Sequence, residues 1–416
     1  MTDILPHLLL ALAAVIVVGR LLAKLFAYIG QPPVIGEVVA GILLGPSLLG
    51  SELSGKVLPV AVAPYLGALA QLGVVLYMFL VGLELNVGLL RSRGLATLTI
   101  AQACIVLPFL LGVGSAWWLY PVLSDETVPF ASFALFLGVA MSITAFPVLA
   151  RILTDRGIDK TELGVLALGC AAIGDVTAWC LLAFVVGVAK DQTFSAVAVA
   201  ALALAYIAFI FLIVRPLTSV LVRRWEKGPI TPATLAWVFA AVLLSALATE
   251  QIGIHAIFGA FLLGAVISHD SRLAHEVTRK THDVVTVLLL PAFFAYTGMR
   301  TEIGLVSGLD QWLLCGAIIV IATTGKFCAA LASARLTGFD WRTSASLGVL
   351  MNTRGLMELI VLNVGLELGV ISRTLFAMMV LMALVTTMAT TPILCLMNRG
   401  PRSSVTESPA TSASAS

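Results

Sequence analysis

The chain has 416 residues, of which 60% are hydrophobic and 11% are charged. Soluble domains carry about 25% charged residues, so this composition excludes an ordinary soluble enzyme and indicates a protein embedded in a lipid bilayer. The formal net charge of +2 gives no sign of a nucleic-acid partner.

Apolar runs follow one another along the chain, and a run needs about 20 residues to cross a bilayer. The Ser- and Ala-rich residues 400–416 are too polar to fold, so we expect a disordered cytoplasmic tail. Residues 1–399 would then form one transmembrane domain of an all-helical, multi-pass protein. We predict about thirteen membrane segments, near residues 5–29, 34–50, 62–85, 94–120, 128–153, 161–189, 194–222, 232–250, 254–269, 284–300, 310–334, 343–368 and 373–397.

The distribution of Lys and Arg over the loops predicts the orientation. With the N-terminus outside, the outer loops contain only Lys56, Lys190, Arg300 and Arg373. The inner loops then contain Arg20, Lys24, Arg91, Arg93, Arg151, Arg156, Lys160, Arg223, Arg224, Lys227, Arg272, Arg279, Lys280, Arg335, Arg342, Arg399 and Arg402. We therefore expect a cell-membrane protein with an outside N-terminus and a cytoplasmic C-terminus.

An odd number of segments predicts two six-helix repeats of opposite orientation, at 5–189 and 232–397, joined by a linker helix at 194–222. Weak sequence echoes support this arrangement. Gly36-x4-Gly41 matches Gly259-x4-Gly264, Gly82 matches Gly298, and Thr lies beside a Pro or Gly breaker in both 142–147 and 351–355. Inverted repeats with paired interrupted helices are typical of alternating-access transporters.

Asp175 is the only charged residue in the apolar stretch 170–188. A carboxylate inside a membrane helix costs roughly 2.5–3.5 kcal/mol on insertion scales, so such a residue usually has a function. It can hold a proton or a cation, but not both, and this competition would couple the transport of the two ions. The alternative is a buried Asp bonded to backbone groups of an unwound helix.

Seven stretches of the chain resemble motifs of the cation:proton antiporter superfamily. The resemblance is to the branch that contains the Kef-type potassium/proton antiporters and the plant cation/proton exchangers. The resemblance implies a sodium/proton antiporter fold with a dimerisation domain and a mobile core, a homodimer, and elevator-like exchange of Na⁺ or K⁺ for H⁺. The matching stretches are GQPPVIGEVVAGILLGPSLLG (30–50), FLVGLELN (79–86), SITAFPVLARIL (142–153), AAIGDVTAW (171–179), IGIHAIFGAFLLGAVI (252–267), FFAYTGMRTEI (293–303) and MNTRGLMELIVLNVGLELGVIS (351–372).

The resemblance also assigns the ion site. Asp175 matches the family's ion-binding aspartate, beside two crossed, unwound helices that map to segments five and twelve. Thr144, Asn352 and Thr353 lie at these breaks and offer oxygen atoms, which Na⁺ and K⁺ prefer as ligands. Arg354 has Glu358 four residues later, a spacing that allows a salt bridge on one helix face. We favour a locking role for this pair over direct ion binding.

Gly174 departs from the family, because many relatives carry Asp, Asn or Gln at this position. A second acid there is associated with electrogenic exchange, so Gly174 favours electroneutral exchange. Lys326 matches a lysine that pairs with that acid in relatives. Here it would pair with Asp175 or another core group, or its ammonium would reach the surface along its flexible stem.

Two other classes of protein fit the sequence less well. An intramembrane aspartyl protease needs a second aspartate in mid-membrane, and the predicted segments contain none. A sodium-coupled organic anion transporter of the same fold would use cationic groups at the crossover, and Arg354 leaves it open. We expect no enzymatic activity and no cofactor, and the sequence does not separate Na⁺ from K⁺. His269, His275 and His282 are expected in a solvated loop at 268–283.

Overall fold

A computed structural model describes residues 4–397, except residues 46, 48–49, 51–53, 56, 85–93, 126, 190–192, 226–229 and 254. This described part of the chain contains helices and no strand. The predicted tail at 400–416 lies outside the described residues. So do seven of the cations used to predict the orientation, namely Lys56, Arg91, Arg93, Lys190, Lys227, Arg399 and Arg402.

The helices follow the predicted segments closely in order and position. They are α1 (Ile4–Tyr28), α2 (Pro33–Leu44), η1 (Val60–Val62), α4 (Ala63–Glu84), α5 (Gly94–Leu123), α6 (Phe130–Ser142), α7 (Phe146–Asp155), α8 (Glu162–Ala189), α9 (Thr193–Phe209), the π-helical η3 (Ile210–Val214), α10 (Arg215–Trp225), α11 (Pro232–Ile252), α12 (Ala256–Val266), α13 (Arg272–Val284), the π-helical η4 (Val285–Leu289), α14 (Leu290–Arg300), η5 (Ile303–Leu305), α15 (Gly308–Leu336), α16 (Trp341–Met351), α17 (Leu356–Glu367) and α18 (Arg373–Met397).

Ten helical stretches of the described chain are long and apolar enough to cross a membrane. The pair α16 and α17, bent by 43° at its break, makes an eleventh if it counts as one span. The remaining two predicted segments correspond to α2 and α12, which have 12 and 11 residues. Helices of that length cover only about 16–18 Å of a hydrocarbon layer about 30 Å thick. The exact count of thirteen is therefore not confirmed.

The predicted loop at 268–283 is wrong over most of its length. Helix α13 begins at Arg272, where the Ser271 side chain accepts a hydrogen bond from the backbone N–H of Ala274 at 3.1 Å. A Ser at this position is a strong signal for the start of a helix. The charged residues that follow it suggested a loop by their composition, although their spacing fits a helix with one polar face. His275 and His282 consequently lie on a helix that continues through η4 into α14.

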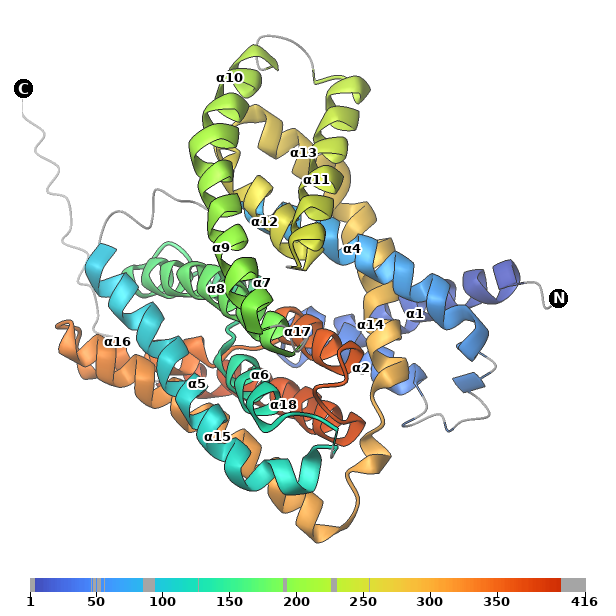
Figure 1. Ribbon diagram of the computed structural model, residues 1–416, viewed down its shortest axis with the longest axis vertical. Coiled ribbons are helices and arrows are strands. Elements are labelled where there is room, and N and C mark those ends of the chain that lie inside the picture. Colours follow the sequence, from blue (N-terminus) through green and yellow to red (C-terminus); the bar gives the residue numbers. More distant parts are fainter. Residues whose placement is uncertain are drawn as a thin grey trace, which may run out of the picture.

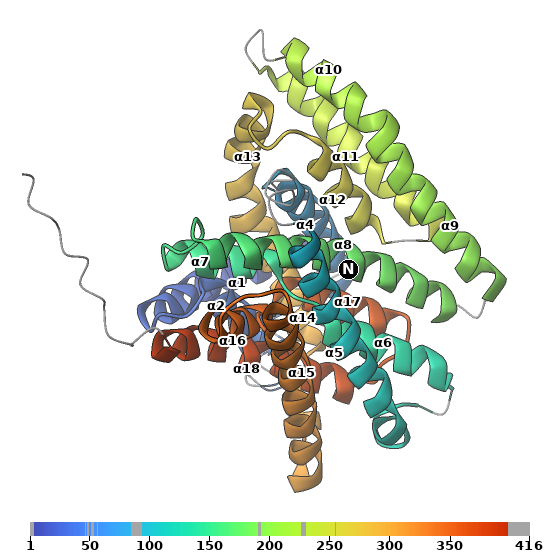
Figure 2. The same cartoon turned by 90° about the vertical axis from the view of Figure 1, so that its left-hand side faces the viewer.

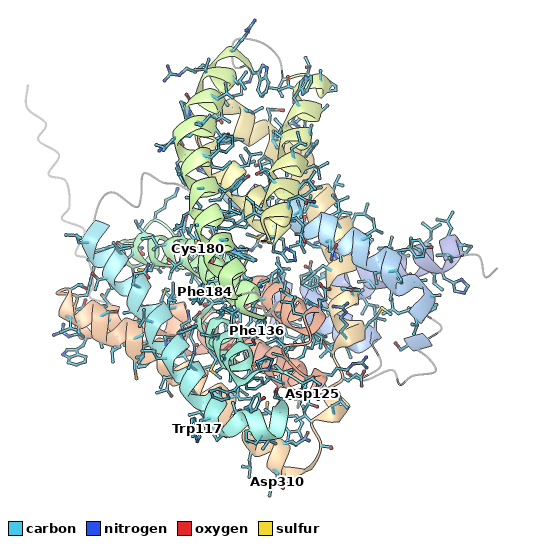
Figure 3. All side chains as sticks on the ribbon, in the orientation of Figure 1. Trp117, Asp125, Phe136, Cys180, Phe184 and Asp310 are labelled. Carbon is cyan, nitrogen blue, oxygen red and sulfur yellow. The ribbon has the colours of Figure 1, made fainter. Side chains whose placement is uncertain are left out.

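The helices divide into two groups by their packing (Figures 1 and 2). The scaffold group consists of α1, α2, α4 and α9–α14, and the core group consists of α5–α8 and α15–α18. Close backbone packing among the described residues joins helices of the same group, apart from the consecutive α8 and α9 and the short η5 against α18. Figure 3 labels Asp310 at the lower edge of the core group, where α15 begins.

The glycine echoes mark the tightest contacts of the scaffold group. A Cβ atom on Gly298 of α14 would lie 1.9 Å from the carbonyl oxygen of Gly41 of α2. Likewise, a Cβ on Gly264 of α12 would lie 2.3 Å from the carbonyl oxygen of Phe79, next to Gly82 of α4. The predicted inverted repeats would pair α2 with α12 and α4 with α14, and the two contacts would then be equivalent.

We expect Gly298→Ala and Gly264→Ala each to destabilise the protein. The added methyl group would meet backbone oxygen atoms that cannot rotate away, and overpacking of this kind costs about 1–3 kcal/mol or more. Thermal unfolding in detergent, followed by size-exclusion chromatography, measures the effect. Gly114→Ala on α5 is the control, since nothing lies within 4 Å of its Cβ position and Ala favours a helix by about 1 kcal/mol. Equal melting temperatures for all three variants would contradict the expectation.

Candidate functional site

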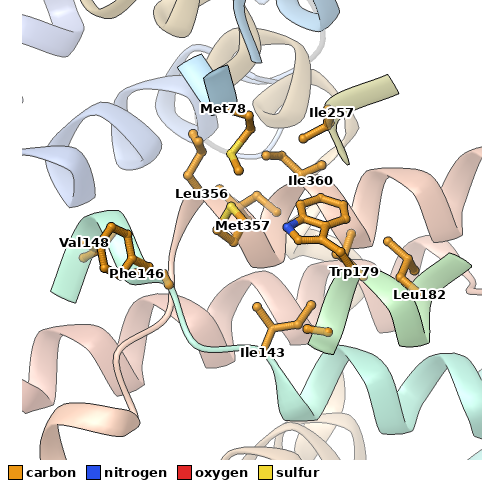
Figure 4. Close-up of a cluster of buried hydrophobic side chains, with 14 of the residues drawn as sticks. Met78, Ile143, Phe146, Val148, Trp179, Leu182, Ile257, Leu356, Met357 and Ile360 are labelled. Carbon is orange, nitrogen blue, oxygen red and sulfur yellow. The ribbon is translucent and has the colours of Figure 1, made fainter. Parts of the chain in front are cut away.

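Two broken helices cross in the middle of the core group. The first break separates α6, which ends at Ser142, from α7, which begins at Phe146. The second separates α16, ending at Met351, from α17, beginning at Leu356. The breaks touch through a backbone hydrogen bond of 3.0 Å from Ala145 N to Thr353 O. Both connections are visible in Figure 4 as extended segments beside the labelled side chains.

Local sequence explains both breaks. Pro147 has no N–H group, so it fits the first turn of α7 but not the interior of a continuous helix. In the second break, a Cβ atom on Gly355 would lie 2.8 Å from the side chain of Val148. A glycine there allows the two connections to approach each other. The predicted crossing of segments five and twelve is confirmed.

Two buried cations satisfy the end of α6, where a helix leaves its last carbonyl groups without intrahelical partners. Arg354 donates to the carbonyl oxygens of Ala140 at 3.1 Å and Met141 at 2.8 Å. Lys326 donates to the carbonyl oxygen of Ser142 at 2.5 Å. Positive charge is also favoured at this end of a helix by the macrodipole. Arg354 and Lys326 thus replace the hydrogen bonds that the break removes.

Lys326 lies on α15 and is fully buried. Its ammonium group also donates to Thr144 Oγ1 at 2.5 Å, and Thr144 in turn donates to the carbonyl oxygen of Met351 at 3.2 Å. The alternative in which Lys326 reaches the surface is therefore wrong. The ammonium makes no hydrogen bond to Asp175.

Arg354 and Glu358 form the predicted salt bridge, with Nη1 3.2 Å from both carboxylate oxygens. Both side chains are completely buried. The backbone of Arg354 is held as well, because its N–H donates to Thr387 Oγ1 at 2.8 Å and its carbonyl accepts from the same hydroxyl at 2.7 Å. The pair is fixed between α6, α17 and α18, which agrees with a locking role.

Asp175 lies on α8 with only 2% of its surface exposed. Neither carboxylate oxygen has a hydrogen-bond partner, so the alternative of an Asp bonded to backbone groups is wrong. Asp175 lines a cavity of about 10 Å³, which is close to the volume that one water molecule requires. The cavity is lined by Ile143, Asp175, Ala178, Trp179, Met357 and Val361.

An apolar cluster covers the cavity towards the scaffold group. Met78 of α4 and Ile257 of α12 lie with Ile360 of α17 and Trp179 in this cluster (Figure 4). All are less than 4% exposed. In this conformation Asp175 is therefore almost completely out of contact with solvent.

The other predicted ligands lie at the crossover, but outside the lining of this cavity. Thr144 is bonded as described above. The Thr353 hydroxyl donates to the carbonyl oxygen of Leu350 at 2.7 Å. The side-chain oxygen of Asn352 is buried without a partner. The structure thus brings Thr144, Thr353, Lys326 and Arg354 together at the crossover. Asp175 lines a cavity to which none of these four residues contributes.

Trp179 and Thr387 belong to this region and were missed from the sequence. Trp179 follows Asp175 by four residues, which is the spacing of neighbours on one helix face, so its place beside the carboxylate could have been inferred. Thr387 had no such signal. It lies on α18, and only the tertiary fold brings it to the second break.

Crossed, interrupted helices with buried charges in mid-membrane are the features of a secondary transporter. Within this class, the family model described as sodium/hydrogen exchanger, transmembrane, matches residues 12–396. The chain belongs to this family.

Individual relatives agree with this assignment. The chain is 44% identical to the Na(+)/H(+) antiporter NhaS4 of Synechocystis sp., over 93% of the chain and 96% of that protein. It is 39% identical to Cation/H(+) antiporter 19 of Arabidopsis thaliana, over 96% of the chain and 50% of the relative. It is 33% identical to K(+)/H(+) antiporter 1 of Saccharomyces cerevisiae, over 91% of the chain and 45% of the relative. The chain thus spans about half the length of the plant and yeast relatives.

A solved structure confirms the predicted fold class. The sodium proton antiporter MjNhaP1 from Methanocaldococcus jannaschii superposes with a TM-score of 0.68, and the match covers 93% of this chain and 96% of the other. The sequences are 15% identical, so the comparison concerns the fold alone.

Proposed function

We propose that the protein is a secondary antiporter that exchanges a monovalent cation, Na⁺ or K⁺, for H⁺. The observation that carries the proposal is Asp175, which has a buried carboxylate without a hydrogen-bond partner and lines a cavity of about 10 Å³. A buried carboxylate is costly unless a bound cation compensates its charge or a bound proton makes it neutral. Exclusive occupation by one or the other couples their movement. The relatives' printed names include both Na⁺/H⁺ and K⁺/H⁺ antiporters, which fits this function.

Reconstitution into liposomes that contain a pH-sensitive dye tests the function. External Li⁺, Na⁺, K⁺ and Rb⁺ are added in separate runs, and the change in internal pH is compared with that of protein-free liposomes. The proposal requires at least one of these cations to drive proton flux. A response to none of them across the range from pH 6 to pH 9 would contradict it.

The rival functions find no support at the site. An organic anion transporter would use Arg354 as its cationic group. The guanidinium group of Arg354 donates hydrogen bonds to Glu358 and to two backbone carbonyl groups, so both of its terminal nitrogens already have partners. Asp175 accepts no hydrogen bond from a second carboxyl group, as an aspartyl protease would require. We retain the predicted homodimer, cell-membrane location and outside N-terminus as parts of the proposal.

We propose an elevator-type motion in which the core group moves against the scaffold group. Close backbone packing between the groups is sparse among the described residues, which supports this motion. A polar cluster joins them near the ends of α14 and α17. Arg300 of α14 lies 2.9 Å from Glu367 of α17, and the Asn363 side chain donates to Thr297 Oγ1 at 3.0 Å. These contacts would break in each cycle.

Cross-linking tests this motion. In Thr297→Cys/Asn363→Cys, a disulfide would join α14 to α17 and hold the two groups together. We expect an oxidant such as copper phenanthroline to arrest exchange by at least ten-fold and dithiothreitol to restore it. The two single variants, which retain the six native cysteines, are the controls. Full exchange in the verified cross-linked protein would exclude a relative motion of α14 and α17.

We propose that exchange is electroneutral, because Gly174 removes the second acid. One positive charge then crosses in each direction per cycle. Setting the membrane potential with an ionophore that does not carry the tested cation is expected to leave the final cation and proton gradients unchanged. A steady-state balance that shifts with voltage would contradict a single titrating carboxylate.

Gly174→Asp provides the matched comparison. A Cβ at position 174 meets nothing within 4 Å, so the first side-chain carbon of the variant meets no clash. With a second proton site, two protons would exchange for one cation. A potential of 100 mV acts on the extra charge with about 2.3 kcal/mol, which corresponds to roughly fifty-fold in the final cation ratio. The assay is therefore sensitive enough to detect a second charge.

A further inference from the structure

Trp179 lines the cavity of Asp175 and carries an unexplained polar group. Its indole N–H is buried without a hydrogen-bond partner, and the residue is 3% exposed. The two carboxylate oxygens of Asp175 are also unpartnered, and both residues line the same cavity. A residue with an unpaired donor and a residue with two unpaired acceptors therefore line one cavity, and its other described lining residues, Ile143, Ala178, Met357 and Val361, are apolar.

This arrangement is energetically unusual for a residue that only fills space. Burying a donor without a partner costs about 1–3 kcal/mol. A phenylalanine would pack against Ile143 and Met357 without that loss. In addition, α8 places residues four apart on one face, so the indole and the carboxylate are held in a fixed relation by the helix itself.

We propose that Trp179 is a positioning residue of the ion site, whose indole N–H holds one oxygen of Asp175 through a shared water molecule and leaves the other oxygen for the cation. This inference rests on the proposed antiport function. The cavity is large enough for about one water molecule, which would accept from the indole and donate to the carboxylate.

The bond favours the cation-loaded state over the proton-loaded state. With a cation bound the carboxylate is ionised, and with a proton bound it is neutral. Hydrogen bonds to an ionised acceptor are roughly twice as strong as those between neutral groups. Removing the indole N–H should therefore weaken cation binding, while the movement of the loaded core is unaffected.

Trp179→Phe removes the donor and retains an aromatic ring. We expect the KM for the transported cation to rise about ten-fold, with kcat within two-fold of the wild type. Binding is measured independently of transport by the rise in melting temperature that the cation causes, since a ligand that binds the folded state stabilises it. The variant should need about ten-fold more cation for the same rise. Trp237→Phe, on the exposed face of α11, is the matched control.

The outcomes separate the two proposals. If the wild type shows neither cation-dependent proton flux nor cation-dependent stabilisation, the antiport function fails. If the wild type shows both and Trp179→Phe equals it in KM and in stabilisation, only the role of Trp179 is overturned. A loss of kcat with unchanged KM would also overturn it. Should Trp179→Phe fail to fold, Trp179→Tyr, whose donor lies at a different place on the ring, replaces it in both measurements with the same expected rise.

Discussion

Asp175→Asn is expected to abolish cation-dependent proton flux, to below one hundredth of the wild-type rate. Asparagine neither titrates nor carries a negative charge, so the competition between proton and cation disappears. The variant should fold normally, because neither carboxylate oxygen makes a hydrogen bond that the substitution would remove and the two side chains are nearly equal in volume. Dye-based flux in proteoliposomes, together with size-exclusion chromatography of the same preparation, measures both expectations.

Asp310→Asn is the control for this substitution, since Asp310 lies at the exposed start of α15 in the first helical turn. It should transport like the wild type. Flux near the wild-type rate in folded Asp175→Asn would disprove Asp175 as the shared site of proton and cation.

Arg354→Gln is expected to produce the largest loss of stability, on the order of 3–5 kcal/mol. The substitution leaves Glu358 buried and ionised without its partner. It also removes the donors to the carbonyl groups of Ala140 and Met141 at the end of α6. Melting temperatures and the yield of monodisperse protein in detergent report the loss.

The double variant Arg354→Gln/Glu358→Gln separates the two contributions. Removing both charges of a buried pair costs much less than removing one, so the double variant should regain part of the lost melting temperature. The part that is not regained measures the capping of α6. A double variant less stable than Arg354→Gln would contradict the assignment of Glu358 as the unpaired charge.

The sequence predicted the fold well where a physical constraint leaves a pattern in the chain. Bilayer thickness produced the long apolar runs, and backbone contact between helices required the glycines at 41, 264 and 298. It failed at α13, where Ser271 begins a helix that the charged composition concealed. The sequence did not settle the number of membrane spans, because α2 and α12 are too short to cross a bilayer alone. Both helices pack closely against their neighbours.

The site was only partly predictable. Asp175 is a candidate because it is a lone charge in an apolar run, and its role as the ion site stays a prediction. The spacing of Arg354 and Glu358 indicated their salt bridge, which the structure contains. The partners of Lys326 were not predictable. They are the carbonyl oxygen of Ser142 and the hydroxyl of Thr144, and a backbone carbonyl leaves no mark on the sequence that would identify it as a lysine partner.

Four charged side chains are buried in the described part of the core group, and they have a consequence for the electrical behaviour of the proposed exchanger. Arg354 and Lys326 balance Glu358 and Asp175 when all four are ionised, so binding either a proton or a monovalent cation gives the moving core one net positive charge. A potential of 100 mV then contributes about 2.3 kcal/mol per charge that crosses the whole field. An inside-negative membrane would favour the inward position of the loaded core, whichever ion it carries. Voltage would accelerate one half of the cycle and slow the other, and would thereby set the turnover rate while leaving the final gradients unchanged.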